Sequence, residues 1–267
     1  MSLLIAAILV MGLYLAYQRL MPVLAGSGCA AKGGGQMIAL GAGQAGIAAT
    51  IAGVAQRDHL PARAVTVAYA AAMQESKLQN LPYGDRDSVG VFQQRPSQGW
   101  GKRSELEDPV YATSKFFGAL VKVPGYQRLP VYQAAQDVQR SADGFAYEQY
   151  QRMAAGMAVA FTGRSPHAVW CWYTQKISGT AHTGAASAGL AQAFGPLRAR
   201  ASADPGLLVQ ARGAREGWAM AAWLVAHALQ YQISSVQYAG YRWAAPAGAR
   251  GWARAVSPAP AGTIELH

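Results

Sequence analysis

Glu75 is the residue of this chain whose setting best fits acid–base chemistry. It lies near the end of residues 61–76, where the apolar spacing predicts a helix. At 100° per residue, Glu75 lies within about 60° of three alanines and shares their small apolar face. These alanines are Ala68, Ala71 and Ala72. An unpaired carboxylate there is desolvated, which favours the protonated form that can donate a proton to a glycosidic oxygen. Pairing with Lys77 or Arg86 would make Glu75 an ordinary surface residue instead.

A second carboxylate would decide between two kinds of glycosidic cleavage. A hydrolase needs a second carboxylate or a positioned water. Asp85 and Asp87, in the segment GDRDS, are the candidates, and Asp87 is the better one because it adjoins the segment GVFQ. The competing interpretation is that both aspartates only fix a turn, since Asp side chains often bond to turn backbone.

Metal and nucleophilic sites are not indicated. The five histidines have no mutual spacing typical of a metal site or a Ser/His/Asp triad, and Cys29 and Cys171 have no CxxC pattern. We therefore expect no metal and no cofactor.

The first two thirds of the chain have the helical pattern that must position Glu75. Residues 26–35 (GSGCAAKGGG) are glycine-rich and are expected to be a flexible connector. Asp108 followed by Pro109 marks a helix start. Irregular structure with a short hairpin is expected over residues 77–101. The other expected helices cover residues 44–56, 61–76, 131–140 and 145–162.

The remainder divides into three parts. Residues 173–207 are rich in Ala, Gly, Ser and Thr and are expected to be a linker. The sequence pattern of residues 208–257 predicts a small helix-plus-β-hairpin module. Its helix covers residues 215–231 and is followed by the strands ISSVQYAG and YRWAA. Trp243 and Trp252 could cover this hairpin, and residues 258–267 are expected to be a frayed tail.

The sequence from Glu75 onwards also contains motifs that resemble those of a known family. Glu75-Ser76, followed by Gly90-Val91-Phe92-Gln93, resembles the ES and GLMQ-like motifs of lytic transglycosylases and goose-type lysozymes. The run AMQESKLQNLPYGDRDSVGVFQQRPSQGWG is similar to a family of actinobacterial secreted or membrane-anchored proteins with a lysozyme-like domain. The similarity extends over about residues 40–162. It implies a mainly α fold, with a lysozyme-like helical domain over residues 28–172.

The resemblance also implies roles for individual residues. Glu75 would protonate the bridging oxygen of peptidoglycan glycan strands, and a C6 hydroxyl of the sugar would then attack C1. Ser76 would orient Glu75 or help to position the sugar, and Gln93 would line the groove. Trp100 and Tyr147 are expected as groove residues. The segment AYEQY, which contains Tyr147, departs from the AYNAG-like motif by lacking its Asn and Gly.

The N-terminus and this chemistry together predict the location. Residues 3–17 carry no charge, and with the apolar run to Gly26 they suit a membrane anchor over residues 1–27, although a cleaved signal segment is the alternative. We expect a single-pass protein with extracytoplasmic domains. In that oxidising setting Cys29 and Cys171 can form a disulfide, and two unpaired cysteines are the alternative.

Charge and composition restrict the partners. The net charge of +10 favours anionic partners, but the basic residues are scattered and nothing resembles a nucleic-acid module. The expected partners are peptidoglycan strands and the membrane through residues 3–25, with components of an envelope complex as further candidates. Two alternatives to an enzyme are a non-catalytic module that binds cell-wall glycan, and a structural part of a secretion or conjugation apparatus.

Overall fold

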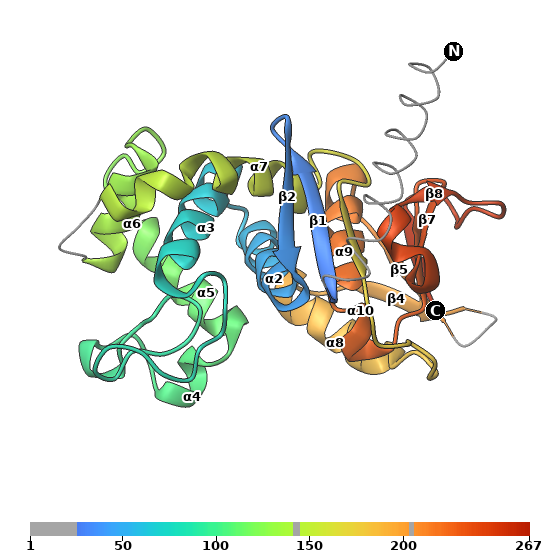
Figure 1. Cartoon of the computed structure of the whole chain (residues 1–267), viewed down its shortest axis with the longest axis horizontal. Coiled ribbons are helices and arrows are strands. Elements are labelled where there is room, and N and C mark those ends of the chain that lie inside the picture. Colours follow the sequence, from blue (N-terminus) through green and yellow to red (C-terminus); the bar gives the residue numbers. More distant parts are fainter. Residues whose placement is uncertain (1–25, 141–144, 203–205) are drawn as a thin grey trace, which may run out of the picture.

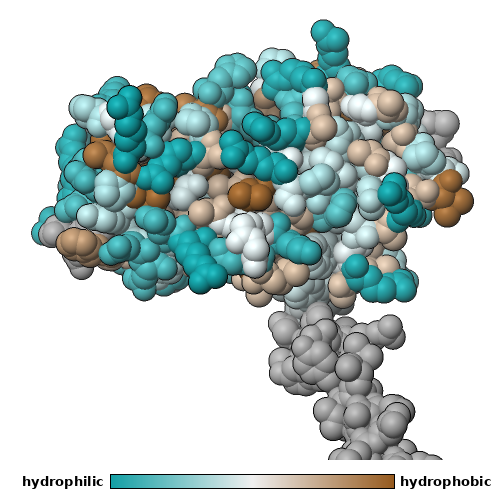
Figure 2. All heavy atoms as spheres, turned by 90° about the horizontal axis from the view of Figure 1, so that it is seen from above, coloured by the Kyte–Doolittle hydropathy of each residue, from teal (hydrophilic) through white to brown (hydrophobic). Residues whose placement is uncertain are grey.

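The fold combines helices with two antiparallel sheets. The computed structural model describes residues 26–140, 145–202 and 206–267. Helices contain 47% and strands 18% of the chain, so the expectation of a mainly α fold was wrong. In Figure 1, helices α3 to α6 lie on one side, the β1–β2 hairpin in the middle, and strands β4, β5, β7 and β8 on the other side. The surface in Figure 2 is largely hydrophilic, with apolar side chains in separate spots.

The predicted membrane anchor, residues 1–27, lies almost wholly outside the described residues. Over the ranges that the structure describes, no helix is both long enough and apolar enough to cross a bilayer.

The helical part begins and ends its helices close to the predicted positions. Asp108 caps α5, since its Oδ1 accepts a hydrogen bond of 2.8 Å from the Val110 N–H. The chain turns at Pro61 and enters α3, as expected. The helices are α2 (Ala42–Arg57), α3 (Ala62–Ser76), α4 (Arg103–Leu106), α5 (Pro109–Leu120), α6 (Val131–Gln139) and α7 (Gln151–Phe161). The 3₁₀ helices here are η1 (Pro96–Gln98) and η2 (Phe145–Tyr150).

Helix α3 is the buried centre of this part. Every residue from Ala64 to Met73 is buried, and α3 packs against α6, α7 and η2. Small side chains permit this close packing, because alanine lets neighbouring backbones approach. The Tyr69 hydroxyl donates a hydrogen bond of 2.7 Å to the Ala48 carbonyl and so joins α3 to α2. The helix that carries Glu75 is therefore held firmly on several sides.

The glycine-rich segment 26–35 is not the flexible connector that was expected. It contains β1 (Gly28–Gly33), which pairs with β2 (Gln36–Gly41) and with β3 (Val169–Trp172) in the order β2-β1-β3. Gly34 and Gly35 have φ of 58° and 74°, which suits a two-residue hairpin turn. A Cβ on Gly33 would lie 2.1 Å from the Gly156 carbonyl oxygen of α7. The glycines thus serve a turn and a close backbone contact.

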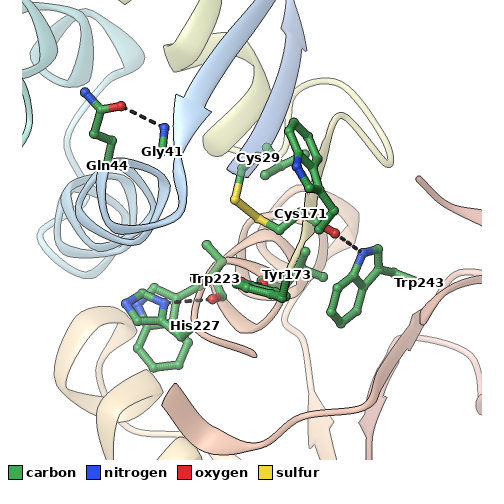
Figure 3. The surroundings of a disulfide bond; sticks show 12 residues. Cys29, Gly41, Gln44, Cys171, Tyr173, Trp223, His227 and Trp243 are labelled. Atoms are coloured by element: carbon green, nitrogen blue, oxygen red, sulfur yellow. Dashed lines mark hydrogen bonds between the residues drawn. A yellow bond between two sulfur atoms is a disulfide. The ribbon is translucent and has the colours of Figure 1, made fainter. Parts of the chain in front are cut away.

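A disulfide joins two neighbouring strands of this sheet that lie far apart in the sequence. Cys29 of β1 and Cys171 of β3 are direct partners in the strand register and are bonded to each other, which confirms the predicted pair (Figure 3). Both cysteines are fully buried. The bond closes a loop with a sequence separation of 142 residues. In the chain-entropy view, such a long loop restricts the unfolded state strongly.

The C-terminal part is larger than predicted. The expected linker 173–207 contains α8 (Thr183–Phe194) and β4 (Arg198–Ala201), and the expected tail contains β9 (Thr263–Leu266). Strand β9 lies in the interior of a six-stranded sheet with the order β4-β5-β9-β6-β7-β8. The other elements are β5 (Leu207–Gln210), α9 (Ala214–Ala226), α10 (Ala228–Tyr231), β6 (Ser235–Tyr238), β7 (Tyr241–Ala244), η3 (Ala245–Arg250) and β8 (Ala253–Arg254).

Two tryptophans dock this second sheet onto the first. Trp243 Nε1 donates a hydrogen bond of 3.0 Å to the Cys171 carbonyl (Figure 3), and Trp252 Nε1 donates one of 2.7 Å to the Val169 carbonyl. Trp243 is fully buried. In α8, Phe194 packs so closely on Gly53 of α2 that a Cβ there would lie 2.8 Å from its ring. Helix α8 therefore packs against α2 and α9, and the segment 173–207 is not a spacer.

Candidate active site

Glu75 lies in the last turn of α3, on the alanine face that the sequence predicted. The three alanines of that face are fully buried, whereas Glu75 is half-buried at its edge. The carboxyl group therefore stands between the core and solvent. Glu75 forms no salt bridge with Lys77 or Arg86, because Arg86 faces Asp85 and the Lys77 ammonium group bonds to the Tyr150 hydroxyl.

The chain turns sharply directly after Glu75. Lys77 and Leu78 have φ of 56° and 57°, a left-handed conformation that costs roughly 1 kcal/mol for each non-glycine residue. The Leu78 N–H donates a hydrogen bond of 3.0 Å to the Ala72 carbonyl and closes the helix end. Strained backbone of this kind clusters at functional sites. The turn leaves Glu75 at the helix end and directs the chain into the loop of residues 77–101.

Tyr147 of η2 contacts Glu75 directly. Its hydroxyl donates a hydrogen bond of 2.7 Å to Glu75 Oε1. Tyr147 is only 1% exposed, so its ring belongs to the core and is not available to stack on a sugar, as a groove residue would. The hydrogen bond fixes the orientation of the carboxyl group and engages one of its two oxygens.

Ser76 joins α3 to the GVFQ segment. The residue is buried, and its hydroxyl donates a hydrogen bond of 2.7 Å to the Val91 carbonyl. The same oxygen accepts a bond of 3.1 Å from the Gln79 N–H. Ser76 therefore joins the end of α3 to the turn after Glu75 and to the GVFQ segment, and its hydroxyl is occupied by these partners.

Gln93 shapes the loop of residues 77–101 that follows α3. Its φ is 47°, and its Nε2 lies within hydrogen-bonding distance of two carbonyls, those of Tyr83 (3.3 Å) and Gly90 (3.1 Å). Its Oε1 lies 3.1 Å from Ser88 Oγ. A single antiparallel β-bridge between Leu81 and Gly90 joins the two limbs of the same loop. Gln93 is therefore engaged in holding the two limbs of this loop together.

Asp87 is engaged within the same loop. Arg95 Nε donates a bond of 2.9 Å to its Oδ1, and the Ser97 N–H donates one of 2.7 Å to its Oδ2. The Arg95 guanidinium, aided by Ser97, holds the pKa of Asp87 well below its usual range. This arrangement stabilises the loop that carries η1. It leaves both oxygens of Asp87 occupied and puts neither in hydrogen-bonding contact with Glu75.

Trp100 lines the wall of a different hollow. A cavity of about 780 Å³ lies between α5, the end of α6 and the η1 loop, and Trp100 is half-buried in its lining. Lys115, Lys122 and Arg140 also line it. Glu75 is not one of its lining residues, so the structure does not bring Trp100 together with Glu75 there.

Two exposed aromatic residues flank the loop and η2. Tyr83, whose carbonyl lies beside Gln93, is 68% exposed, and Phe145, two residues before Tyr147, is 67% exposed. The Phe145 ring stacks on Tyr132 with centroids 4.8 Å apart. Exposed aromatic rings suit the apolar faces of sugars. The sequence contains no pattern that separates Phe145 from the buried phenylalanines, so it was not predicted.

Metal ligands are not gathered near this site. In residues 26–140, 145–202 and 206–267, no group of three or more His, Cys, Asp or Glu is arranged to hold an ion. No protein-family model matches this chain, and no curated protein matches it.

Proposed function

We propose that this protein cleaves β-1,4 glycosidic bonds in the glycan strands of peptidoglycan, with Glu75 as general acid and base. The observation that carries the proposal is the hydrogen bond from Tyr147 to Glu75 Oε1. It orients a half-buried carboxyl group at the end of a rigid helix, where Oε2 can exchange a proton with a sugar. Groups positioned in this way are what general acid–base catalysis needs.

A single carboxyl group suits a lytic transglycosylase better than a hydrolase. Glu75 gives its proton to the bridging oxygen as the bond between that oxygen and C1 breaks. The C6 hydroxyl of the same sugar then bonds to C1 and returns its proton to Glu75, which leaves a 1,6-anhydro ring. No water is consumed. Asp87, the candidate second carboxylate, is bound by Arg95 and Ser97, which favours this one-carboxylate mechanism over hydrolysis.

The disulfide supports an extracytoplasmic place of action. Cys29 and Cys171 are bonded, and such bonds persist mainly outside the cytoplasm. Peptidoglycan is also outside the cytoplasm, so substrate and enzyme would share a compartment.

Incubation of the full-length protein with purified peptidoglycan tests the proposal. Mass spectrometry of the soluble products should show 1,6-anhydro-muropeptides for the wild type and none for Glu75→Gln. Reducing-end products instead would identify a hydrolase. Binding to peptidoglycan without soluble products, unchanged by Glu75→Gln, would reject the enzyme in favour of a wall-binding module.

A further inference from the structure

A basic groove lies on the two sheets, away from the helix that carries Glu75. It consists of two cavities, of about 540 Å³ and 320 Å³, that share Arg250 and Gly251 at the end of η3. The larger cavity lies against strands β6 to β8, and the smaller one lies where η3 meets β1, β2 and β3. We call the pair the Arg250 groove.

The floor of the larger cavity is one face of the second sheet. Arg242 of β7 is the register partner of Gln237 on one side and Ala253 on the other, so these side chains lie on the same face. Gln237 and Ala253 line the cavity together with Arg242. The alanines that line this cavity have small side chains, which leaves it open beside the long side chain of Arg242. Arg254 of β8 also borders the cavity, and its guanidinium carbon lies 4.5 Å from the centroid of the Tyr241 ring.

The charge of the Arg250 groove is not balanced within it. The cations that line it are Arg242, Arg250, Arg254 and Lys32, and no Asp or Glu is among the described residues that line either cavity. The side chains of Arg242, Arg250 and Lys32 form no hydrogen bond or ion pair with the described part of the chain. By contrast, Arg95, Arg103 and Arg212 each form an ion pair with a carboxylate. Unpaired cations around a hollow favour an anionic ligand.

Aromatic and apolar groups line the smaller cavity beside these cations. Trp170 of β3 and Trp252 are half-buried there, and Met37 of β2 is 60% exposed. Trp252 is held by its hydrogen bond to the Val169 carbonyl, and Gly251 lies against the indole of Trp170. A fixed indole next to cations can pack against the C–H face of a sugar ring while the cations bind its acidic substituents.

We propose that the Arg250 groove binds an anionic glycan. Arg242, Arg250 and Lys32 would hold its carboxylate or phosphate substituents, and Trp170 would pack against a sugar ring. A glycan fits better than a lipid surface because the cations border concave hollows, whereas a bilayer needs protruding ones. The disulfide-bonded sheet next to the groove favours an extracytoplasmic polymer over nucleic acid.

The groove is independent of the chemistry at Glu75. The groove would hold the protein on an acidic wall polymer. The site at Glu75 would meanwhile cleave, or only bind, a neighbouring glycan strand. Two linked sites for one insoluble polymer raise the local concentration at the second site.

Binding to carboxymethyl-dextran, with unmodified dextran of the same length as the neutral probe, tests this inference. The full-length protein should bind the first and not the second. The double variant Arg242→Gln/Arg250→Gln should weaken binding by about tenfold or more, as expected for loss of charge-assisted bonds. The matched control is Arg198→Gln/Arg200→Gln, which removes the same charge from the exposed strand β4 outside the groove. Control binding should stay near that of the wild type.

Three results would overturn the inference. Equal weakening by both double variants would mean that only the overall charge matters. Equal binding of neutral and carboxymethylated dextran would remove the role of the cations. Binding to vesicles rich in phosphatidylglycerol that depends on Arg242 and Arg250, without binding to carboxymethyl-dextran, would assign the surface to a membrane. Glu75→Gln should retain dextran binding, so loss of cleavage and loss of groove binding are separate outcomes.

Discussion

Tyr147 and Glu75 are 72 positions apart in the sequence, yet the Tyr147 hydroxyl lies 2.7 Å from Glu75 Oε1. Helix α3 brings one partner and the 3₁₀ helix η2 brings the other, and these two elements pack directly against each other. The hydrogen bond is possible only when both elements are in place. The orientation of the proposed catalytic group therefore depends on the assembled helical core.

Replacing Tyr147 with Phe tests this dependence. The ring would still fill its buried place, but Glu75 would lose its hydroxyl partner. We expect kcat on peptidoglycan fragments to fall by about tenfold to a hundredfold while KM changes little, because the loss affects orientation in the transition state. The melting temperature should fall only slightly.

Tyr132→Phe is the matched control. Tyr132 lies nearby on α6 and stacks on Phe145, but forms no bond to Glu75. Its variant should keep wild-type kcat. Equal losses in both variants would show that Tyr147 acts through general packing and not through Glu75.

Asp87→Asn separates loop stabilisation from catalysis. Because the folded-state pKa of Asp87 is depressed by Arg95 and Ser97, its charged form stabilises the fold above the ordinary aspartate pKa. That contribution is lost as the pH falls towards the depressed value. The variant should therefore melt below the wild type at pH 7, and the difference should shrink in acid.

The products of Asp87→Asn distinguish the two roles. If Asp87 only holds the loop, the variant should still release anhydro-muropeptides, as long as the assay temperature is well below its melting point. A variant that melts like the wild type but releases no products would instead assign a catalytic role to Asp87.

His227 should make the stability of the fold depend on pH. Its ring stacks on Trp223 at 4.0 Å between centroids, its Nδ1 lies 2.8 Å from the Trp223 carbonyl, and burial lowers its pKa to about 4 (Figure 3). In the unfolded chain this histidine has a pKa near 6.5, so the unfolded state takes up the proton first as the pH falls. The contribution of neutral His227 to the free energy of unfolding is therefore complete above about pH 6.5 and declines down to about pH 4. The loss at pH 4.5 should be about 2 kcal/mol.

Chemical denaturation at pH 7 and pH 4.5 measures this loss. In His227→Gln the difference between the two pH values should be smaller than in the wild type by about that amount. His59→Gln, which replaces an exposed histidine, is the control and should leave the difference unchanged. A wild-type-like difference in His227→Gln would refute the role of His227.

Loss of the disulfide should be the largest single perturbation among these changes. The loop it closes is long, and the chain-entropy model gives about 5 kcal/mol for a loop of this size. Cys29→Ser/Cys171→Ser should therefore lower the free energy of unfolding by roughly 2–5 kcal/mol. Mass spectrometry of alkylated protein with and without reduction checks the bond itself. Identical masses would show that the cysteines are unpaired.

Local signals in the sequence predicted the helices well. Pro61, the Asp108-Pro109 pair and the apolar spacing of residues 215–231 act within a turn or two of the chain, so they can be interpreted without knowledge of the fold. The hairpin of β6 and β7 was predicted for the same reason. Its turn places Ala239 and Gly240 at positive φ.

Long-range pairing was not predictable from these signals. Strand β1 has a composition typical of a linker, and its partner β3 lies more than a hundred residues away. Strand β9 has only four residues, too few for a periodic pattern, and gains its stability from pairing with both β5 and β6. The burial of Tyr147 likewise depends on packing between α3 and η2, which the motif AYEQY does not encode by itself.

The bond between Cys29 and Cys171 has a consequence for damage to the backbone. Glu75, Asp87, Gln93 and Tyr147 all lie inside the covalent ring that it closes. A protease that cuts once at any peptide bond between the two cysteines would open the ring without separating its pieces. Nicked molecules would keep both halves of the proposed active site on one covalent chain, and would come apart only after reduction.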